Sequence, residues 1–390
     1  MPTADNHEPD PRPTPAGLDK AGLDADRPDA DGSASPVGTV YLVGAGPGDP
    51  KLITLAGVEA LQRADVVLYD YLVNPVLTAH APPSANCICL GRHGTTRIWS
   101  QAEINARLVA EAQAGRCVVR LKSGDPAIFG RLMEETPWLA HHQVPFVIVP
   151  GITAASAAGA YAGVHVTHRE HASAVAFVTG HEAPHKTGAP LDFRQLAQFP
   201  GTLVIYMGVT NAQKWTSELM AGGLSPQTPV KLIRKCSQPD QRTISCSLEE
   251  VSGELTPYSK FPPPVIAIVG KVSAQPEAHQ WFSSRPLFGK SVLIARPRAQ
   301  CGELETQLNA AGARTLVQPA IEIHPPSSWE ALDTATDRLS DFGWVVFSSA
   351  NGVRSFCRRL MARGHDARAL AGCQLAAIGP GTARALAEFG

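Results

Sequence analysis

The chain has 390 residues, of which 44% are hydrophobic and 18% charged, and its formal net charge is −1. This length exceeds one ordinary hydrophobic core, so two or three folded domains are expected. A net charge near zero argues against a protein whose main role is to bind nucleic acid. It still allows a local basic cleft for an acidic small molecule.

Residues 1–36 are rich in Asp, Pro, Gly and Ala and contain eight acidic but only three basic residues. Such a segment buries too little apolar surface to fold, so a disordered tail is predicted rather than a targeting signal or membrane anchor. No stretch reaches the about 20 apolar residues that cross a bilayer. We expect a cytoplasmic protein with no membrane partner.

The eight cysteines form no C-x-x-C pair and show no zinc-ligand spacing, so they are interpreted as reduced thiols. His141 and His142 have no matching ligand cluster elsewhere and are interpreted as a polar patch. No metal site is therefore predicted.

In residues 37–172, short apolar runs alternate with amphipathic segments, which predicts a mostly parallel sheet covered by helices on both faces. The strands expected there are 39–43, 66–69, 117–121 and 146–149, and the clearest helices are 52–64 and 101–114. A second block of this kind is expected over 173–274, with strands at 174–178, 202–206, 230–233, 243–246 and 265–269. The predicted fold class is α/β, with two domains and a cleft between them.

Residues 275–289 are polar and contain Pro276 and Pro286, so they are predicted to be a linker. The strand–helix pattern restarts over 290–390, with strands at 291–295, 344–347 and 374–378. No closing strand follows the last of these. Because an open sheet would keep an unpaired edge there, 290–390 is expected to be a partial domain.

Loops rich in small residues follow several predicted strands, and they cover 44–50, 120–126, 149–156 and 206–208. Open α/β sheets bind ligands at the carboxyl ends of their strands, so these loops are expected to line a site. The first loop resembles a dinucleotide fingerprint, but Gly48 falls one position early and Pro50 disfavours the helix start that a pyrophosphate needs. In the third loop, Ala157 and Ala158 either leave room for a ligand or allow close helix–sheet packing.

Nine strings occur in one order along residues 38–275. They are VGAGPGDPKLITL (43–55), ADVVLYDYLV (64–73), QAEINARLV (101–109), VVRLKSGDPAIFGR (118–131), VPGITAASAAGAYAGV (149–164), VTHRE (166–170), VTGHE (178–182), LVIYMG (203–208) and PPVIAIVGKV (263–272). With these strings the segment resembles the tetrapyrrole methylase family, and within it the branch that methylates uroporphyrinogen III. The resemblance implies methyl transfer from S-adenosylmethionine to two pyrrole rings, giving precorrin-2 for sirohaem or cobalamin biosynthesis. It also implies a small-molecule tetrapyrrole substrate and a homodimer.

The resemblance implies roles for single residues. Those expected to surround S-adenosylmethionine are Pro47, Ser123, Gly124, Asp125, Ile128, Thr153, Ala154, Met207 and Cys236. Asp125, followed by a proline, could instead cap a helix. Ser123 and Cys236 stand where the family usually has glycine. Contacts between the backbone there and the ligand would still form, but a positive φ, which glycine adopts easily, would not be retained.

Asp70, at the end of a predicted strand, is implied to be the proton acceptor, with a solvated turn aspartate as the alternative. Arg92 stands where the family has a lysine with a proton-donor role. Arginine hardly releases a proton at neutral pH, so either that role is dispensable or Arg92 instead binds a substrate carboxylate. Uroporphyrinogen carries eight carboxylates, and the residues expected to bind them are Arg97, Lys122, Arg131, His168 and Arg169.

The last segment contains VLIARP (292–297), FGWVVFSSANGVRSF (342–356) and LAAIGPGTARAL (375–386). It resembles the amino-terminal part of uroporphyrinogen-III synthases and covers less than half of their length, so its activity is left open. Two other hypotheses for the whole chain are a methylase acting on another precorrin and a catalytically impaired protein that binds or channels tetrapyrroles.

Overall fold

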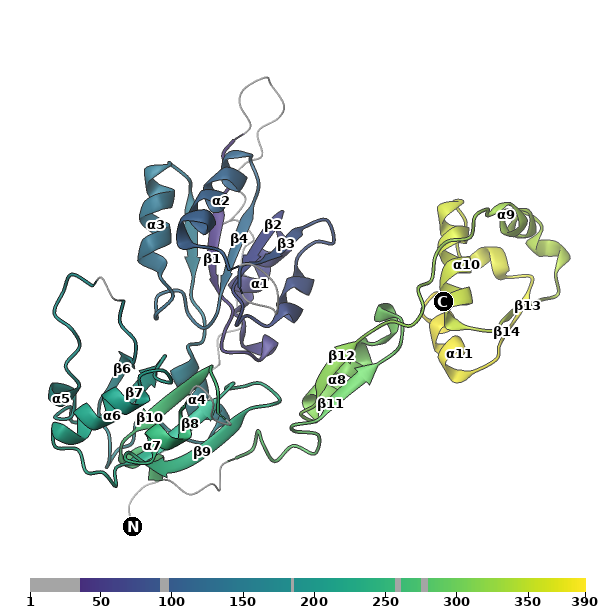
Figure 1. The fold of residues 1–390 in the computed structure, drawn as a ribbon. Coiled ribbons are helices and arrows are strands. Elements are labelled where there is room, and N and C mark those ends of the chain that lie inside the picture. The colour runs from purple at the N-terminus through teal and green to yellow at the C-terminus, as the bar shows by residue number, and fades with distance from the viewer. Residues whose placement is uncertain (1–35, 92–97, 184–185, 257–260, 275–279) are drawn as a thin grey trace, which may run out of the picture. The chain divides into compact units, whose positions relative to one another are not determined.

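A computed structural model describes residues 36–91, 98–183, 186–256, 261–274 and 280–390 (Figure 1). The chain divides into two compact units. The first covers the described residues up to Gln238 and those from Arg242 to Ala274. The second covers Pro239–Gln241 and the described residues from 280 onward. Each unit is described separately.

The first unit begins with a five-stranded sheet in the order β3-β2-β4-β1-β5, in which every pairing is parallel. Its strands are β1 (Val40–Gly44), β2 (Val66–Tyr69), β3 (Asn86–Cys89), β4 (Val118–Lys122) and β5 (Phe146–Val149). The predicted parallel sheet is therefore confirmed. Strand β3 was not predicted, because its sequence NCIC is short and only partly apolar.

Helices cover both faces of this sheet. They are α1 (Leu55–Gln62), α2 (Gln101–Gln113) and α3 (Leu132–His141). Successive strand residues point to opposite faces. On one face Val118 packs with Leu108 of α2 and Leu139 of α3, and on the other Val119 packs with Leu61 of α1. Figure 1 shows α2 and α3 side by side over the sheet.

The second sheet of the first unit has the order β6-β7-β10-β8-β9. Its strands are β6 (Val175–Thr179), β7 (Thr202–Tyr206), β8 (Pro229–Arg234), β9 (Arg242–Ser247) and β10 (Val265–Val269). Only β6 and β7 pair in parallel; the other three pairings are antiparallel. The expected second α/β block is present, but its strand runs did not predict this direction of pairing. Seven residues join β8 to β9, which is too few for a parallel crossover.

Helices also cover the second sheet. They are α4 (Ala154–Tyr161), α5 (Phe193–Leu196), α6 (Ala212–Ala221) and α7 (Val251–Glu254). Phe193 of α5 and Trp215 of α6 share one hydrophobic cluster with strand residues such as Leu232. Ala157 and Ala158 of α4 are buried in a second cluster with Val204 and Ile268. For these two alanines, the packing alternative is therefore confirmed.

The second unit contains two parallel strand pairs, β11 with β12 and β13 with β14. Its elements are β11 (Ser291–Ile294), α8 (Gly302–Ala310), β12 (Arg314–Val317), α9 (Glu330–Thr336), β13 (Trp344–Phe347), α10 (Ala350–Ala362), β14 (Gln374–Ala377) and α11 (Pro380–Ala387). The described part of the predicted linker, 280–289, is packed in this unit. Phe282 is 1% exposed and lies 3.9 Å from the Arg285 guanidinium. The predicted domain boundaries themselves stay a prediction.

Short 3-10 helices complete the two units, and they are Pro50–Leu52, Pro75–His80, Lys271–Ala274, Arg298–Gln300, Leu339–Asp341 and Ala367–Leu370. Within the described parts of the chain, no helix combines the length and apolar character needed to span a bilayer.

Candidate functional site

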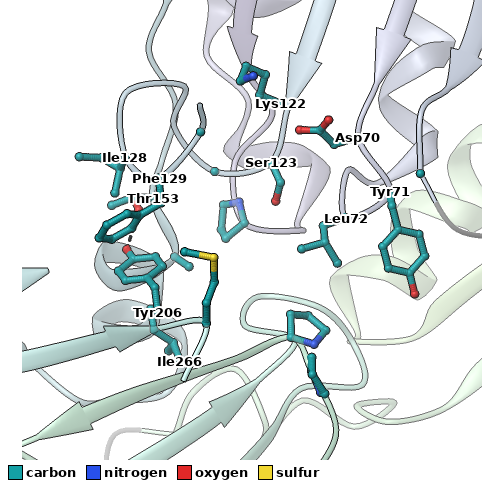
Figure 2. Close-up of a pocket in the computed structure, with 18 of the residues that line it drawn as sticks. Asp70, Tyr71, Leu72, Lys122, Ser123, Ile128, Phe129, Thr153, Tyr206 and Ile266 are labelled. Carbon is teal, nitrogen blue, oxygen red and sulfur yellow. Dashed lines mark hydrogen bonds between the residues drawn. The ribbon is translucent and has the colours of Figure 1, made fainter. Parts of the chain in front are cut away.

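A cavity of about 800 Å³ lies in the first unit, at the carboxyl ends of strands from both of its sheets (Figure 2). All four loops that the sequence singled out contribute to its lining. Figure 2 shows Asp70 and Lys122 on one side of the cavity and Tyr206 and Ile266, from the second sheet, on the other. Its volume falls within the range of small-molecule sites, about 300–1,000 Å³.

The first three of these loops touch each other through their backbones. Gly46 and Gly124 exchange two hydrogen bonds between their amides and carbonyls, with lengths of 2.8 and 3.1 Å. A Cβ on Gly151 would lie 2.3 Å from the Gly124 carbonyl oxygen and 2.8 Å from Cα of Gly44. Glycine is therefore required at Gly151 because backbone occupies the space of a side chain.

The first loop is also tied to the second sheet. The Asp49 amide donates to Oγ of Ser237 at 3.0 Å, and the Tyr161 hydroxyl donates to Oδ2 of Asp49 at 3.1 Å. Pro50 starts only a 3-10 turn, and the next α-helix begins at Leu55. The glycine loop thus lacks the adjoining helix start that a dinucleotide pyrophosphate uses.

The structure brings all the predicted cofactor residues to the cavity wall. They are Pro47, Ser123, Gly124, Asp125, Ile128, Thr153, Ala154, Met207 and Cys236. Gly124 has φ 70°, and a Cβ there would meet only Cα of Thr153, at 3.9 Å. Ser123 and Cys236 keep φ outside the left-handed region, so the two replacements of glycine cause no strain of this kind.

Backbone strain is concentrated at the cavity. Six described residues other than glycine have positive φ, and four of them line the cavity. These four are Phe129, Arg131, Met207 and Lys235, with φ between 49° and 55°. Met207, which is 50% exposed, presents its thioether there. Strained residues persist where surrounding structure holds them and are common at functional sites.

Asp125 holds two loops together. Its Oδ1 accepts the Ala127 amide and its Oδ2 accepts the Gly151 amide, both at 2.8 Å. The segment that follows is a turn rather than a helix, so Asp125 is not the helix cap considered as an alternative. It organises the cavity wall and keeps lone pairs for a ligand.

Tyr206 joins the second sheet to the start of α4, a feature that the sequence reasoning missed. Its hydroxyl accepts the Ala155 amide at 3.0 Å and lies 2.7 Å from Oγ1 of Thr153. Burial raises the pKa of Tyr206, so the hydroxyl keeps its proton and can donate it to Thr153. The only available signal was its position at a strand end before Met207.

Asp70 follows β2 and lines the cavity, where its carboxylate forms an ion pair with Arg120. Arg120, at 3% exposed, also binds the carboxylate of Glu135 through Nε at 3.1 Å. Nζ of Lys122 binds the other Glu135 oxygen at 2.6 Å. The four side chains form a network in the order Asp70, Arg120, Glu135 and Lys122, in which carboxylates and cations alternate.

Lys122 was expected to bind a substrate carboxylate, and this role stays a prediction. Lys122 lines the cavity but is 2% exposed and already paired with Glu135. Burial and then the neighbouring Arg120 charge lower the pKa of Lys122, while Glu135 opposes this shift. Sequence reasoning missed Glu135, because a single Glu in an amphipathic helix usually faces solvent.

The other residues predicted to bind substrate separate into three groups. Arg131 lines the cavity and pairs with Glu134, with Nε and Nη2 at 2.6 and 2.5 Å from the two carboxylate oxygens. His168 and Arg169 are not among the lining residues, so the structure does not bring them to the site as expected. Arg92 and Arg97 lie outside the described residues.

Histidine and carboxylate side chains meet in the loop after α4, where His168, Glu170 and His171 offer ligand atoms within 4.8 Å of one another. Nδ1 of His168 accepts the Glu170 amide at 3.1 Å. If the His168 ring is neutral and its Nδ1 accepts this hydrogen bond, its proton is on Nε2. Neither ring nitrogen of His168 then has a free lone pair for a metal. The sequence-based prediction of no metal site stays a prediction.

Cys236 is buried in the cavity wall, and burial raises the pKa of its thiol to about 12. A thiol with this pKa is protonated at neutral pH and is a poor nucleophile. Cys236 is therefore expected to contact a ligand non-covalently and not to attack it.

Comparisons with known proteins agree with this geometry. The family model of tetrapyrrole (corrin/porphyrin) methylases matches residues 39–252, and that of uroporphyrinogen-III synthase HemD matches 302–390. A porphyrin biosynthesis protein HemD from Ruminiclostridium josui is 36% identical over 353 residues, which cover 90% of this chain and 70% of the relative. It spans both matched segments in one chain.

Two further relatives match the first unit. An S-adenosyl-L-methionine-dependent uroporphyrinogen III methyltransferase from Methanosarcina barkeri is 45% identical over 60% of this chain and 92% of its own. A uroporphyrin-III C-methyltransferase from Thermus thermophilus, solved with S-adenosylhomocysteine, is 39% identical, with a TM-score of 0.52 over 60% of this chain and 98% of its own. The predicted methyl donor agrees with both.

Proposed function

The chain belongs to the tetrapyrrole methylase family, and we propose that its first unit transfers methyl groups from S-adenosylmethionine to two pyrrole carbons of uroporphyrinogen III. The product is then precorrin-2. The observation that carries the proposal is the cavity in the first unit, whose wall holds every residue that the family motifs predict for the methyl donor. Relatives named for this reaction cover the same segment.

The cavity wall fits the donor chemically. Gly124 leaves open space beside its backbone, and a ligand can approach the Gly46–Gly124 bridge closely. The Met207 thioether and the Ile128 side chain offer apolar contacts to a sulfonium ligand. S-adenosylmethionine supplies an activated methyl group. The protein then has to hold the pyrrole carbon in line with that group and keep water away, which supplies most of the rate.

A proton must leave for each methyl group that joins a carbon, because the sulfonium loses its charge and the methylated pyrrole must regain neutrality. We propose that Asp70 accepts this proton. It lines the cavity, and its carboxylate is held by Arg120 from the neighbouring strand β4. A carboxylate held at the cavity wall supports this role, because a general base must come within hydrogen-bond reach of the proton that it removes.

The substrate's carboxylates require cations, and Arg131 is the proposed partner among the described lining residues. Its Nε and Nη2 bind Glu134, which orders the guanidinium and leaves Nη1 to donate to a second carboxylate. Arg92, Arg97, His168 and Arg169 stay predictions from the sequence, as does the homodimer.

The second part of the chain suggests where the substrate comes from. Residues 302–390 match the uroporphyrinogen-III synthase family, and a synthase makes the substrate that the methylase would use. One chain would thus link consecutive steps toward sirohaem or cobalamin. The proposal assigns no synthase activity to this segment.

Anaerobic incubation of the purified chain with uroporphyrinogen III and S-adenosylmethionine tests the proposal, with products read by mass spectrometry. We expect a product heavier by two methyl groups and two molecules of S-adenosylhomocysteine for each one formed. No methylation of uroporphyrinogen III, with methylation of another precorrin in a parallel incubation, would favour the second methylase hypothesis. Tight tetrapyrrole binding with no mass change would favour a binding or channelling protein.

A further inference from the structure

A buried carboxylate lies behind the cavity wall, and no step of the proposed reaction uses it. Glu135 of α3 is 0% exposed and is not one of the lining residues. Its Oε1 accepts from Nε of Arg120 at 3.1 Å and from Nε2 of Gln101 at 3.3 Å. Its Oε2 accepts from Nζ of Lys122 at 2.6 Å. All three donors line the cavity.

The strand pattern explains why these groups meet. Val118, Arg120 and Lys122 alternate along β4 and so point to the same face of the sheet. Val118 lies in the cluster covered by α2 and α3. Gln101 begins α2 and Glu135 lies in the first turn of α3, so both helices deliver polar groups to the carboxyl end of that face.

The neighbouring strand extends the same row. Asp70 continues the alternation of Val66 and Leu68 in β2, and its Oδ1 binds Nη2 of Arg120. Arg120 therefore joins Glu135, inside the protein, to Asp70, at the cavity. Its Nη1 also donates to the Leu121 carbonyl at 3.2 Å, which limits other orientations of the guanidinium.

Charge balance requires Glu135 at this place. Isolated buried charges are strongly disfavoured unless they are paired and hydrogen-bonded. Arg120 and Lys122 are both nearly fully buried, and Asp70 is the other carboxylate in the network. Without Glu135, two adjacent cations would share the single carboxylate of Asp70, which would move toward them and away from its position at the cavity.

We propose that Glu135 is a positioning residue for methyl transfer: by binding Arg120 and Lys122 with its two oxygens, it fixes the guanidinium that holds Asp70 at the cavity. The inference rests on the proposed function only for the identity of the reaction. Glu135 itself does not touch the substrate or the methyl donor. Its effect reaches the reacting groups through Arg120 and through the charge of Lys122.

The test compares Glu135→Gln with a matched control, Glu111→Gln. Glu111 of α2 is also buried, at 3% exposed, and pairs with two arginines, Arg107 and Arg116, but it does not line the cavity or contact the network. Both variants remove a buried negative charge between two cations. The side chains of Arg107 and Arg116 are 38% and 49% exposed, whereas those of Arg120 and Lys122 are each 3% exposed. The thermal unfolding of each variant is therefore measured as well, so that kcat is compared only at temperatures where both are folded.

For Glu135→Gln we expect kcat to fall by about tenfold or more, since misplacing a reacting group by about 1 Å can cost 100-fold. KM for the tetrapyrrole and Kd for S-adenosylhomocysteine should stay within about threefold of wild type. Glu111→Gln should keep the wild-type kcat. Equal kcat values in Glu135→Gln and wild type, or equal losses in both variants, would overturn the proposal.

The pH profile separates positioning from a general structural effect. The groups that act on the Lys122 charge are Glu135, Arg120 and Asp70, and Glu135 raises the pKa of Lys122. Removing the Glu135 charge should let Lys122 lose its proton at lower pH. The alkaline limb of kcat should then move to lower pH in Glu135→Gln. A uniform fall of kcat at every pH would indicate a structural role and would count against the proposal.

If the wild-type protein does not methylate uroporphyrinogen III, the proposed function is refuted. The role of Glu135 is then tested by a measurement that does not depend on activity. The Lys122 side chain can be titrated by NMR of ¹³Cε-lysine protein, with its signal assigned from Lys122→Met. Its midpoint should fall in Glu135→Gln and stay at the wild-type value in Glu111→Gln. An unchanged midpoint in Glu135→Gln would overturn the positioning role.

Discussion

Replacing Gly151 with alanine tests whether the cavity depends on direct contact between backbone loops. The new Cβ would lie 2.3 Å from the Gly124 carbonyl oxygen and 2.8 Å from Cα of Gly44. Both neighbours are backbone atoms of loops at the carboxyl ends of β4 and β1, so no flexible side chain can move aside. The loops must separate, and the hydrogen bond from the Gly151 amide to Asp125 must lengthen or break.

The magnitude follows from two effects. Overpacking of this kind costs about 1–3 kcal/mol. For a folded unit of about 150–250 residues, each kcal/mol lowers Tm by about 2–4 °C. The first unit is close to this size, so its thermal transition should fall by roughly 2–12 °C. The shifted loops should also weaken S-adenosylhomocysteine binding by at least about tenfold, or 1.4 kcal/mol.

Differential scanning calorimetry and isothermal titration calorimetry measure the two effects on the full chain. The control is Gly253→Ala in α7, because a Cβ there meets nothing within 4 Å and the residue lacks a positive φ. Alanine favours a helix over glycine, so this variant should melt at or slightly above the wild-type temperature. If Gly151→Ala melts with wild type and binds S-adenosylhomocysteine equally well, the loop-contact argument is refuted.

Four shorter predictions concern single side chains. Iodoacetamide should alkylate Cys236 at pH 8 about 1,000-fold more slowly than in the unfolded chain, because its pKa rises from 9.0 to about 12; equal rates would contradict its burial. The same raised pKa should stabilise the fold below pH 9, and this contribution should vanish as the pH approaches 12 in alkaline unfolding. Tyr206→Phe should lower the free energy of unfolding by about 1–3 kcal/mol in urea titrations, since the Ala155 amide loses its acceptor; an unchanged midpoint would show that another group replaces it. Arg131→Ala should raise KM for the tetrapyrrole more than Arg169→Ala does, because only Arg131 lines the cavity, and the reverse order would favour the sequence-based role of Arg169.

Much of the fold could be predicted from local patterns. The strands β7 (202–206), β10 (265–269) and β13 (344–347) have the predicted bounds, because each is a continuous apolar run between polar or glycine-containing turns. The direction of pairing in the second sheet was not predictable from those runs. The pairing direction depends on the length of the connection between two strands, and an apolar run contains no information about that length.

Some residues of the candidate site could also be predicted from the sequence, and others could not. Residues in glycine-rich loops after strands could be identified, because loop composition and the carboxyl ends of strands both point to them. The roles of Lys122 and Glu135 could not, because they depend on one helix covering one end of β4. Arg131 and Arg169 show the same limit: both are arginines close to motifs, and only the folded chain separates the residue at the cavity from the one outside it.

The proposed function requires that the cavity at the strand ends of the first unit holds the methyl donor. A crystal structure of the full chain with S-adenosylhomocysteine tests this claim most directly. We expect density for the ligand in the cavity, against Pro47, Gly124 and Met207, with the Asp70–Arg120 ion pair intact beside it. Full occupancy at any other place in the chain, with this cavity empty, would contradict the account.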